Sequence, residues 1–488
     1  MRLGLWYMCL PCLVTLAIIL GPVHAQSLSS NQINVVSWRL AEGATHSWEY
    51  GTRAQVLLEL NAPSYSVFST TLIPPPSGIP SNLTGPLSDV FGIAHAIVAN
   101  RSISNGNITG PQPLMNDSAA GDPASIGVAV LLANWTGQGQ VDGLDYAGAA
   151  RDQLEFLLMN VSRTSDGAIS HRLDQVQLWS DSVYMVPPFL AYYGAVMGNQ
   201  TLLQEAYNQI KLYREYLRDE QANNIWKHIQ LGSYGTDNGH WSAGAHILHY
   251  CHRYTQYLAG NAWAAAGMLH VLSTINHSEF GNSMISQQTD LANWVQEIHD
   301  GMYLHLDSSG LFHNYADDLS TFTDASSTAM LASTVYRLAL LWGVHKHLPA
   351  AELCRRALSA PMDSIINISA SVASSVSPPT SNSTSSSPPA STMVPGTNMP
   401  DMLHFTVDGW LTPVVDPYAF SNQGQTSPEG QAFVLAMQAA WRDWVGVGTK
   451  GVGSAKGVNA AVGTLAPSCP RTVAQAVVAG ILLFVLEM

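Results

Sequence analysis

Residues 201–220 read TLLQEAYNQIKLYREYLRDE, and this stretch decides the fold class. Its apolar side chains recur every three to four positions, so they share one face of an α-helix and leave the other face polar. They are Leu202, Leu203, Ala206, Ile210, Tyr213 and Leu217. No stretch of the chain shows a clear alternation of apolar and polar residues, and the sequence therefore predicts an all-α protein.

The same spacing recurs along most of the chain, in two kinds of helix. Residues 262–275 and 326–341 are apolar or small nearly all round, which is typical of helices buried on most faces. The stretch 201–220 has a polar side and is expected to face solvent. This mixture predicts an inner and an outer layer of helices. Further helices are predicted at 144–161, 182–197, 287–306 and 429–445.

The composition excludes two classes of protein. The 488-residue chain has 11% charged residues and a formal net charge of −14. A nucleic-acid-binding protein needs a basic surface, so no nucleic-acid partner is expected. A hydrophobic content of 47% with 13 tryptophans also excludes a disordered acidic chain. Something other than charge must keep the surface soluble.

The N-terminus and the sequons indicate where the protein is found. Residues 1–25 combine Arg2, an apolar run and a small-residue ending, which predicts a secretory signal peptide. Ten N-x-S/T sequons follow, so we expect a secreted glycoprotein whose glycans replace surface charge. The sequons are at Asn82, Asn100, Asn107, Asn116, Asn134, Asn160, Asn199, Asn276, Asn367 and Asn382. The spacing of Cys251, Cys354 and Cys469 predicts neither a disulfide framework nor a metal site.

The folded domain is predicted to span residues 26–445, with a loop inside it and a tail after it. Residues 368–400 are rich in Ser, Thr and Pro and predict a disordered, O-glycosylated loop. Residues 446–488 form a linker and an apolar tail. The small triplet 459–461, a spacer and the apolar run 473–486 are typical of a GPI-attachment signal, whereas Glu487 is not. Two alternatives stay open for this tail. It is either a GPI-attachment signal, which would give the protein its one attachment to a membrane, or a tail without that role.

Residues 245–260 interrupt an otherwise continuous segment. Deleting them leaves G-H-W-S-A-G-N-A-W-A-A-A-G-M, and the dipeptide Ala-Gly occurs at both edges, at 243–244 and 259–260. We interpret these residues as a retained intron or a gene-model error. A genuine His/Tyr-rich loop is the alternative.

The densest cluster of polar and aromatic residues, 170–185, reads SHRLDQVQLWSDSVYM. Asp181 opens a predicted helix, next to Trp179 and Tyr184. Its carboxylate suits general acid–base catalysis beside an aromatic sugar platform, and capping the helix is the alternative. The sequence contains no phosphate-binding loop, dinucleotide-binding fingerprint or metal-ligand cluster. We therefore expect no cofactor and no metal ion.

Four segments carry a family resemblance. W-S-D-S-V-Y-M followed by V-P-P-F-L-A, residues 179–191, resembles the W-x-D-x-x-(F/Y)-M-x-x-P-F-L segment of unsaturated glucuronyl and rhamnogalacturonyl hydrolases, glycoside hydrolase families 88 and 105. Residues 260–268 resemble their R-G-N-G-W motif, 325–330 their S-A-S-A-M helix start, and 427–433 their G-x-G-A-F segment. The resemblance spans about residues 40 to 445 and implies an (α/α)6 barrel of six helical hairpins, with its site at the ends of the inner helices.

The resemblance also implies site residues. Asp181 corresponds to the aspartate that protonates C4 of a 4,5-unsaturated uronic acid and activates water to attack C5. Asp122, 59 residues upstream, corresponds to a second aspartate, although starting a helix is an equal alternative. Two close carboxylates raise one another's proton affinity, which suits one of them to donate. The residues implied to contact substrate are His171, Trp179, Tyr184, Trp241, Trp263, Ser326 and Ser327.

A purely structural role is the alternative for several of these residues. Trp263 lies in an Ala-rich helix and is also typical of a core residue, and Ser326 and Ser327 would cap their helix as readily as bind a carboxylate. His228 and His240 are either ligands or loop residues.

The chain departs from the family where R-G-N-G-W has its arginine: the residue is Ala259, or Ala243 without the insert. Guanidinium is the natural partner of a carboxylate, so a neutral glycan or a differently bound unsaturated sugar stays open. We expect a secreted glycoside hydrolase that releases unsaturated uronic acid from lyase-generated pectic oligosaccharides. The alternatives are a hydrolase of saturated glycans on the same fold and a catalytically silent, wall-associated glycan-binding glycoprotein.

Overall fold

The computed structural model describes residues 27–104, 106, 109–116, 119–242, 260–364, 398–416 and 422–448. The predicted signal peptide, the interrupting segment up to residue 259, most of the Ser/Thr/Pro-rich loop and nearly all of the C-terminal tail lie outside this part of the chain. Among the described helices, none has the length and apolar character needed to cross a membrane.

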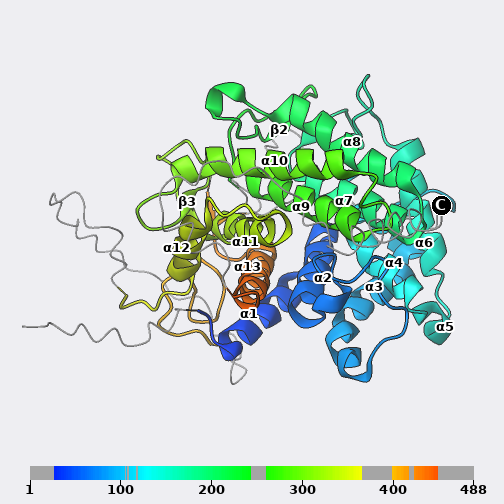
Figure 1. Cartoon of the computed structure of the whole chain (residues 1–488), viewed down its shortest axis with the longest axis horizontal. Helices are drawn as coiled ribbons and strands as arrows, with labels where there is room; N and C mark the ends of the chain where they lie inside the picture. The colour runs from blue at the N-terminus through cyan, green and yellow to red at the C-terminus, as the bar shows by residue number, and fades with distance from the viewer. Residues whose placement is uncertain are drawn as a thin grey trace, which may run out of the picture.

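Six helical hairpins build the described part of the chain, and inner and outer helices alternate along it (Figure 1). The inner helices are α2 (Ser47–Asn61), α4 (Gly127–Trp135), α7 (Ser182–Val196), α9 (Asn261–His277), α11 (Ala325–Trp342) and α13 (Pro428–Gly446). The outer helices are α1 (Ser30–Gly43), α3 (Thr84–Ser104), α6 (Tyr146–Glu155), α8 (Gln200–Leu217), α10 (Ile285–Met302) and α12 (Leu348–Leu358). The predicted (α/α)6 barrel is confirmed.

The inner helices form a closed ring. Each contacts the next in chain order, and α13 returns to α2; in Figure 1 the orange α13 lies beside the blue α1 and α2. The outer helices pack on the outside of this ring, with α8 on α7, α10 on α9 and α12 on α11. Segments from the two ends of the domain are therefore neighbours in space.

Burial separates the two layers as the sequence patterns predict. Every residue of α9 from Asn261 to Ile275 is buried, whereas α8 buries one stripe that includes Leu203, Ile210 and Leu217. Close approach in the ring depends on small residues: a Cβ on Gly127 of α4 would lie 2.2 Å from the Phe189 ring of α7. Larger side chains there would push the helices apart.

All six inner helices point the same way, so their N-termini gather at one end of the ring, which we call the loop end. Three short antiparallel strand pairs lie in the loops that precede these N-termini: β1 (Leu178–Trp179) with β2 (Ile229–Gln230), β3 (Phe312–His313) with β4 (Thr323–Asp324), and β5 (Val414–Val415) with β6 (Gln423–Gly424). The opposite end, where the inner helices terminate, we call the closed end. The short helix α5 (Gln138–Asp142) follows α4 there.

Two features differ from the sequence prediction. Helices α1 to α4 and α12 were not predicted, because α4 is apolar throughout and short, and α3 contains Gly and Pro early in its course. Met399 was assigned to the disordered loop but is 1% exposed, and its N–H donates to Val407 O. The predicted loop is therefore too long at its C-terminal end, because an apolar side chain there is buried in the core.

Candidate active site

Asp122 and Asp181 begin two consecutive elements of the inner ring at the loop end. Asp122 is the first residue of the 3₁₀ helix η3 (Asp122–Ile126), which continues into α4. Asp181 holds the N-cap position of α7, yet its side chain makes no capping hydrogen bond. Because α4 and α7 are neighbours in the ring, the two carboxylates face a common space. The capping alternative for Asp181 does not hold.

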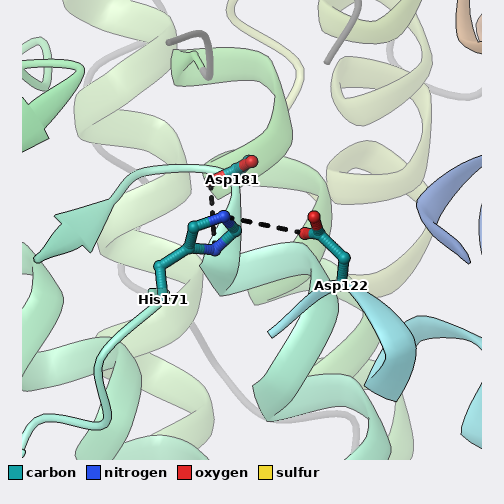
Figure 2. A group of neighbouring side chains, drawn as sticks. All are labelled: Asp122, His171 and Asp181. Atoms are coloured by element: carbon teal, nitrogen blue, oxygen red, sulfur yellow. Dashed lines mark ion pairs between the residues drawn. The ribbon is translucent and has the colours of Figure 1, made fainter. Parts of the chain in front are cut away.

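His171 lies between the two carboxylates (Figure 2). Its Nε2 is 3.8 Å from Asp122 Oδ1 and its Nδ1 is 3.9 Å from Asp181 Oδ1. One nitrogen of His171 and one oxygen of each aspartate lie within 4.8 Å of one another. All three side chains are 0% exposed. Charges shielded from water in this way interact strongly, which suits proton transfer.

Backbone pairing and one glycine place His171 at this point. The Ala120 N–H donates to His171 O at 2.6 Å, so the segment before Asp122 pairs with the segment that carries the histidine. A Cβ on Gly121 would lie 3.2 Å from His171 Nδ1 and 3.2 Å from Ser182 Oγ. Any larger residue at 121 would crowd the imidazole, which would have to shift by a few tenths of an ångström.

Trp179 fixes the plane of the imidazole. Its ring stacks on His171 with centroids 4.3 Å apart and planes inclined by 21°. The indole Nε1 donates to Gln177 Oε1 at 2.7 Å, which anchors the tryptophan from the other side. Trp179 is fully buried. It is therefore first a support for His171, and its predicted role as a sugar platform stays a prediction.

A second histidine stands beside Asp181, and the sequence left its role open. The Ser180 N–H donates to His228 O at 3.1 Å, and His228 Nδ1 lies 2.7 Å from Asp237 Oδ2. Tyr315 Oη also donates to that oxygen, at 3.0 Å. Burial favours the neutral form of Asp237, but the hydrogen bond and charge of His228 outweigh it and lower the pKa of Asp237. This ionised partner orients the His228 ring.

Two buried polar atoms next to Asp181 lack partners in the described structure. They are His228 Nε2 and Ser180 Oγ, on side chains that are 0% exposed. Buried polar groups are normally hydrogen-bonded, so both atoms are available to a bound molecule. Sequence reasoning missed Ser180, whose only signal was its place inside the W-x-D segment.

Trp241 closes the site on the α9 side. Its ring centroid lies 5.3 Å from that of His228, and its indole N–H donates to Asn314 Oδ1. Asn261, the first residue of α9, donates from Nδ2 to Trp241 O at 2.9 Å and to Trp226 O at 3.1 Å. The asparagine of the G-N-A-W segment thus holds two tryptophan-bearing loops together.

Four predicted contact residues make structural contacts, and their contact with substrate stays a prediction. Tyr184 and Trp263 pack edge to face with centroids 4.8 Å apart inside the inner ring, and Trp263 also contacts Phe433. Both rings belong to the hydrophobic core, as the core alternative for Trp263 expects.

The α11 serines are held by Asp324. It accepts from Ser326 Oγ at 2.6 Å and from Ser327 N at 3.1 Å, so Asp324 caps this helix and neither serine does. The predicted contact of the two serines with substrate stays a prediction. Burial raises the pKa of Asp324 to about 6. His240 pairs with Asp317 at 2.7 Å in a loop, away from the aspartate pair.

The three central side chains are also the ligand types that divalent metals prefer, although the sequence predicted no metal site. His171 directs a different ring nitrogen to each carboxylate, and one ion can take only one of these nitrogens. The pattern escaped sequence reasoning because the ligands come from three separate segments.

The family model for Glycosyl Hydrolase Family 88 matches residues 106–373, more than half of the chain. The chain belongs to Glycosyl Hydrolase Family 88. As a family 88 member it is a glycoside hydrolase. The match includes η3, His171, Asp181 and the beginning of α9, so the candidate site lies within it. A comparison with curated proteins gives no match.

Solved structures support the fold of this family 88 chain. A possible member of the GH105 family from Salmonella enterica is 15% identical with a TM-score of 0.54, covering 85% of this chain and 93% of that chain. One from Klebsiella pneumoniae has the same identity and TM-score, covering 91% and 100%. A glycosyl hydrolase family 88 protein from Bacteroides vulgatus is 12% identical with a TM-score of 0.52, covering 86% and 100%. At such identities the likeness shows the fold alone.

Proposed function

We propose that this hydrolase removes a 4,5-unsaturated uronic acid from the end of lyase-generated pectic oligosaccharides. The observation that carries the proposal is the buried pair Asp122 and Asp181, with oxygens within 4.8 Å and His171 between them. One acid–base group with a supporting carboxylate is sufficient for adding water across a double bond.

In the proposed reaction Asp181 acts twice. Its carboxylic acid gives a proton to C4, which leaves positive charge shared between C5 and the ring oxygen. The resulting carboxylate then takes a proton from a water molecule as the water oxygen bonds to C5. The hemiketal at C5 opens to a ketone, and the hemiacetal exposed at C1 releases the remaining sugar. Asp122 and His171 stabilise the positive charge and hold the protonation states of the pair.

The pair suits hydration of an enol ether, because one carboxyl group performs both proton transfers and the second only supports it. Ordinary glycoside hydrolysis instead gives its two carboxyl groups separate roles. The nearest oxygens of Asp122 and Asp181 lie within 4.8 Å, and His171 is close to both.

The uronate carboxylate needs a partner, and the family arginine is replaced by alanine here. We propose that His228 Nε2 and Ser180 Oγ take its place, since both are buried beside Asp181 without partners in the described structure. A hydrogen bond to a charged group contributes about 1.5–3 kcal/mol. His228→Gln and Ser180→Ala should each raise KM by roughly 10- to 100-fold. An unchanged KM in both variants would exclude this assignment.

The deciding assay follows the ultraviolet absorbance of the C4=C5 bond in unsaturated digalacturonate. Wild type should remove the absorbance, and Asp181→Asn should lose activity by roughly 10²- to 10⁴-fold. Asp142→Asn, at the closed end, is a matched control and should keep full activity. EDTA should have no effect, because no step uses a metal. Turnover of saturated glycans alone would contradict the proposal, and binding without turnover would favour the glycan-binding alternative.

We also propose that the protein is a secreted glycoprotein. None of the seven described sequon asparagines is buried: Asn82, Asn100, Asn116, Asn134, Asn160, Asn199 and Asn276. Such positions are accessible to glycan transfer. Protein secreted by a eukaryotic host should lose mass on treatment with an N-glycosidase. Detection of the C-terminal peptide in the mature protein would exclude the GPI alternative.

A further inference from the structure

Two hydrogen bonds join the chain before and after the interrupting segment at the start of α9. The Asn261 N–H donates to Trp241 O at 3.1 Å, and the Ala262 N–H donates to Ser242 O at 3.0 Å. Each bond joins residues 20 positions apart, since 261 − 241 and 262 − 242 both equal 20. Two consecutive bonds with a constant offset are the pattern of a helical turn, in which the offset is four.

Removing residues 245–260 gives both bonds the sequence offset of helical bonds. The segment is 16 residues long, and 20 − 16 leaves an offset of four for each pair. The chain would then read W-S-A-G-N-A-W, with Ala243 and Gly244 directly before Asn261 in the sequence. Donor and acceptor already lie at helical hydrogen-bond distance. To close the turn, the glycine before Asn261, which is extended in the full chain, has to adopt helical dihedral angles.

Contacts outside the segment hold each flank in place. Ser242 N–H donates to Asn314 O at 2.9 Å and Ser242 Oγ to His313 O at 2.6 Å. On the other side, Asn261 Oδ1 accepts from Trp226 N at 2.7 Å. The geometry of the turn therefore does not depend on the segment that separates its two halves.

We infer that residues 245–260 are an insertion between two flanks that the fold already holds at hydrogen-bond distance. Resting on the proposed function, we infer also that the chain without these residues is the catalyst. The insertion enters between Trp241, which closes the site beside His228, and the start of α9. A 16-residue addition at this point enlarges a four-residue turn at the loop end. The shorter chain has less loop entropy to lose on folding, so its stability should not fall.

A deletion series tests the inference by stability alone, so its outcome does not depend on the proposed reaction. The variants are full-length protein, deletion of 245–260, and deletion of 243–260, which leaves an offset of two. We expect the first deletion to melt at or above the full-length temperature. The second should melt roughly 5 °C or more lower, because an offset of two cannot make either bond. Equal melting of the two deletions, or failure of only the first to fold, would overturn the inference.

Two further readouts complete the test. In the 245–260 deletion, amide hydrogen exchange at Asn261 and Ala262 should be as slow as in the full chain or slower. Faster exchange would show that the turn does not form. Activity on unsaturated digalacturonate should be at least that of the full chain, and loss of activity with intact melting would contradict the catalytic half of the inference. If neither form is active while the melting pattern holds, the proposed function fails and the insertion stands.

Discussion

Both ends of the barrel bury carboxyl groups, but the partners of these groups differ between the two ends. At the loop end Asp122 and Asp181 share an imidazole, and burial raises the pKa of Asp324 to about 6. At the closed end Glu59 lies 2.8 Å from Arg337, which also pairs with Asp443 at 2.7 Å. Burial opposes ionisation of Glu59, yet Arg337 and His270 lower its pKa.

This difference separates reactivity from stability. Carboxyl groups that keep or exchange protons can perform chemistry, whereas a carboxylate paired with a guanidinium has a fixed charge and holds helices together. The closed-end network joins α2, α11 and α13, which are the helices that close the ring. We call the closed end the locked end and, on the basis of the proposed function, the loop end the reactive end; each can be tested separately.

The largest effect is expected at the reactive end. Asp122→Asn should lower kcat by roughly 10²- to 10⁴-fold, because the pair loses the carboxylate that supports Asp181. The melting temperature should change little, since the variant removes a buried charge close to another carboxylate. Asp174→Asn is the control, because Asp174 sits at the rim in an ion pair with Arg172. Equal losses in both variants would show that the aspartate pair has no special role.

At the locked end, Arg337→Met should leave activity per folded molecule unchanged but reduce stability. It leaves Glu59 buried without its cation, a change that typically costs about 3–5 kcal/mol. Chemical denaturation measures this loss. The double variant Glu59→Gln with Arg337→Met should recover part of it, because the stranded charge is gone. No recovery would mean that the arginine acts through packing on Phe68, whose ring its guanidinium covers at 4.4 Å.

A packing change should connect the two properties. Gly127→Ala brings a Cβ against Phe189 and pushes α4 away from α7, with an expected cost of about 1–3 kcal/mol. Because these helices carry Asp122 and Asp181, activity should fall as well. Gly92→Ala in the outer helix α3 is the matched control, since a Cβ there meets nothing within 4 Å. Normal activity in Gly127→Ala would show that the carboxylates tolerate movement of the inner helices.

The smallest effects are expected in the pH dependence of stability. Glu59 has a lowered pKa, so its contribution is present above the pKa of the unfolded chain and is lost as the pH falls. Asp324 has a raised pKa, so its contribution is lost as the pH rises towards about 6. In a plot of the free energy of unfolding against pH, Glu59→Gln should reduce the slope on the acid side. Asp324→Asn should reduce the slope between about pH 4 and 6. Each change in slope should be at most about 1.4 kcal/mol per pH unit. Urea denaturation across this range measures both, and a change of slope in the opposite direction would refute the assignment.

The sequence by itself determined the helical class and the two layers, and its resemblance to a family pointed to both aspartates of the candidate site. Helical spacing is local, so residues 201–220 show it without help from the rest of the chain. The W-x-D segment is local too, and it led to Asp181. Asp122 was identified only from its position upstream of that segment, 59 residues before Asp181.

Tertiary structure alone decided which side chains meet. His171 stands between the two aspartates because Ala120 pairs with it, and His228 is oriented by Asp237 and Tyr315, which come from different loops. The same packing placed Tyr184 and Trp263 in the core, since an aromatic residue near a catalytic segment looks alike in sequence whichever way it faces. The sequence indicated that residues 245–260 are an interruption, but only the structure shows the hydrogen bonds that join Trp241 to Asn261 and Ser242 to Ala262, because partners 20 positions apart leave no periodic signal.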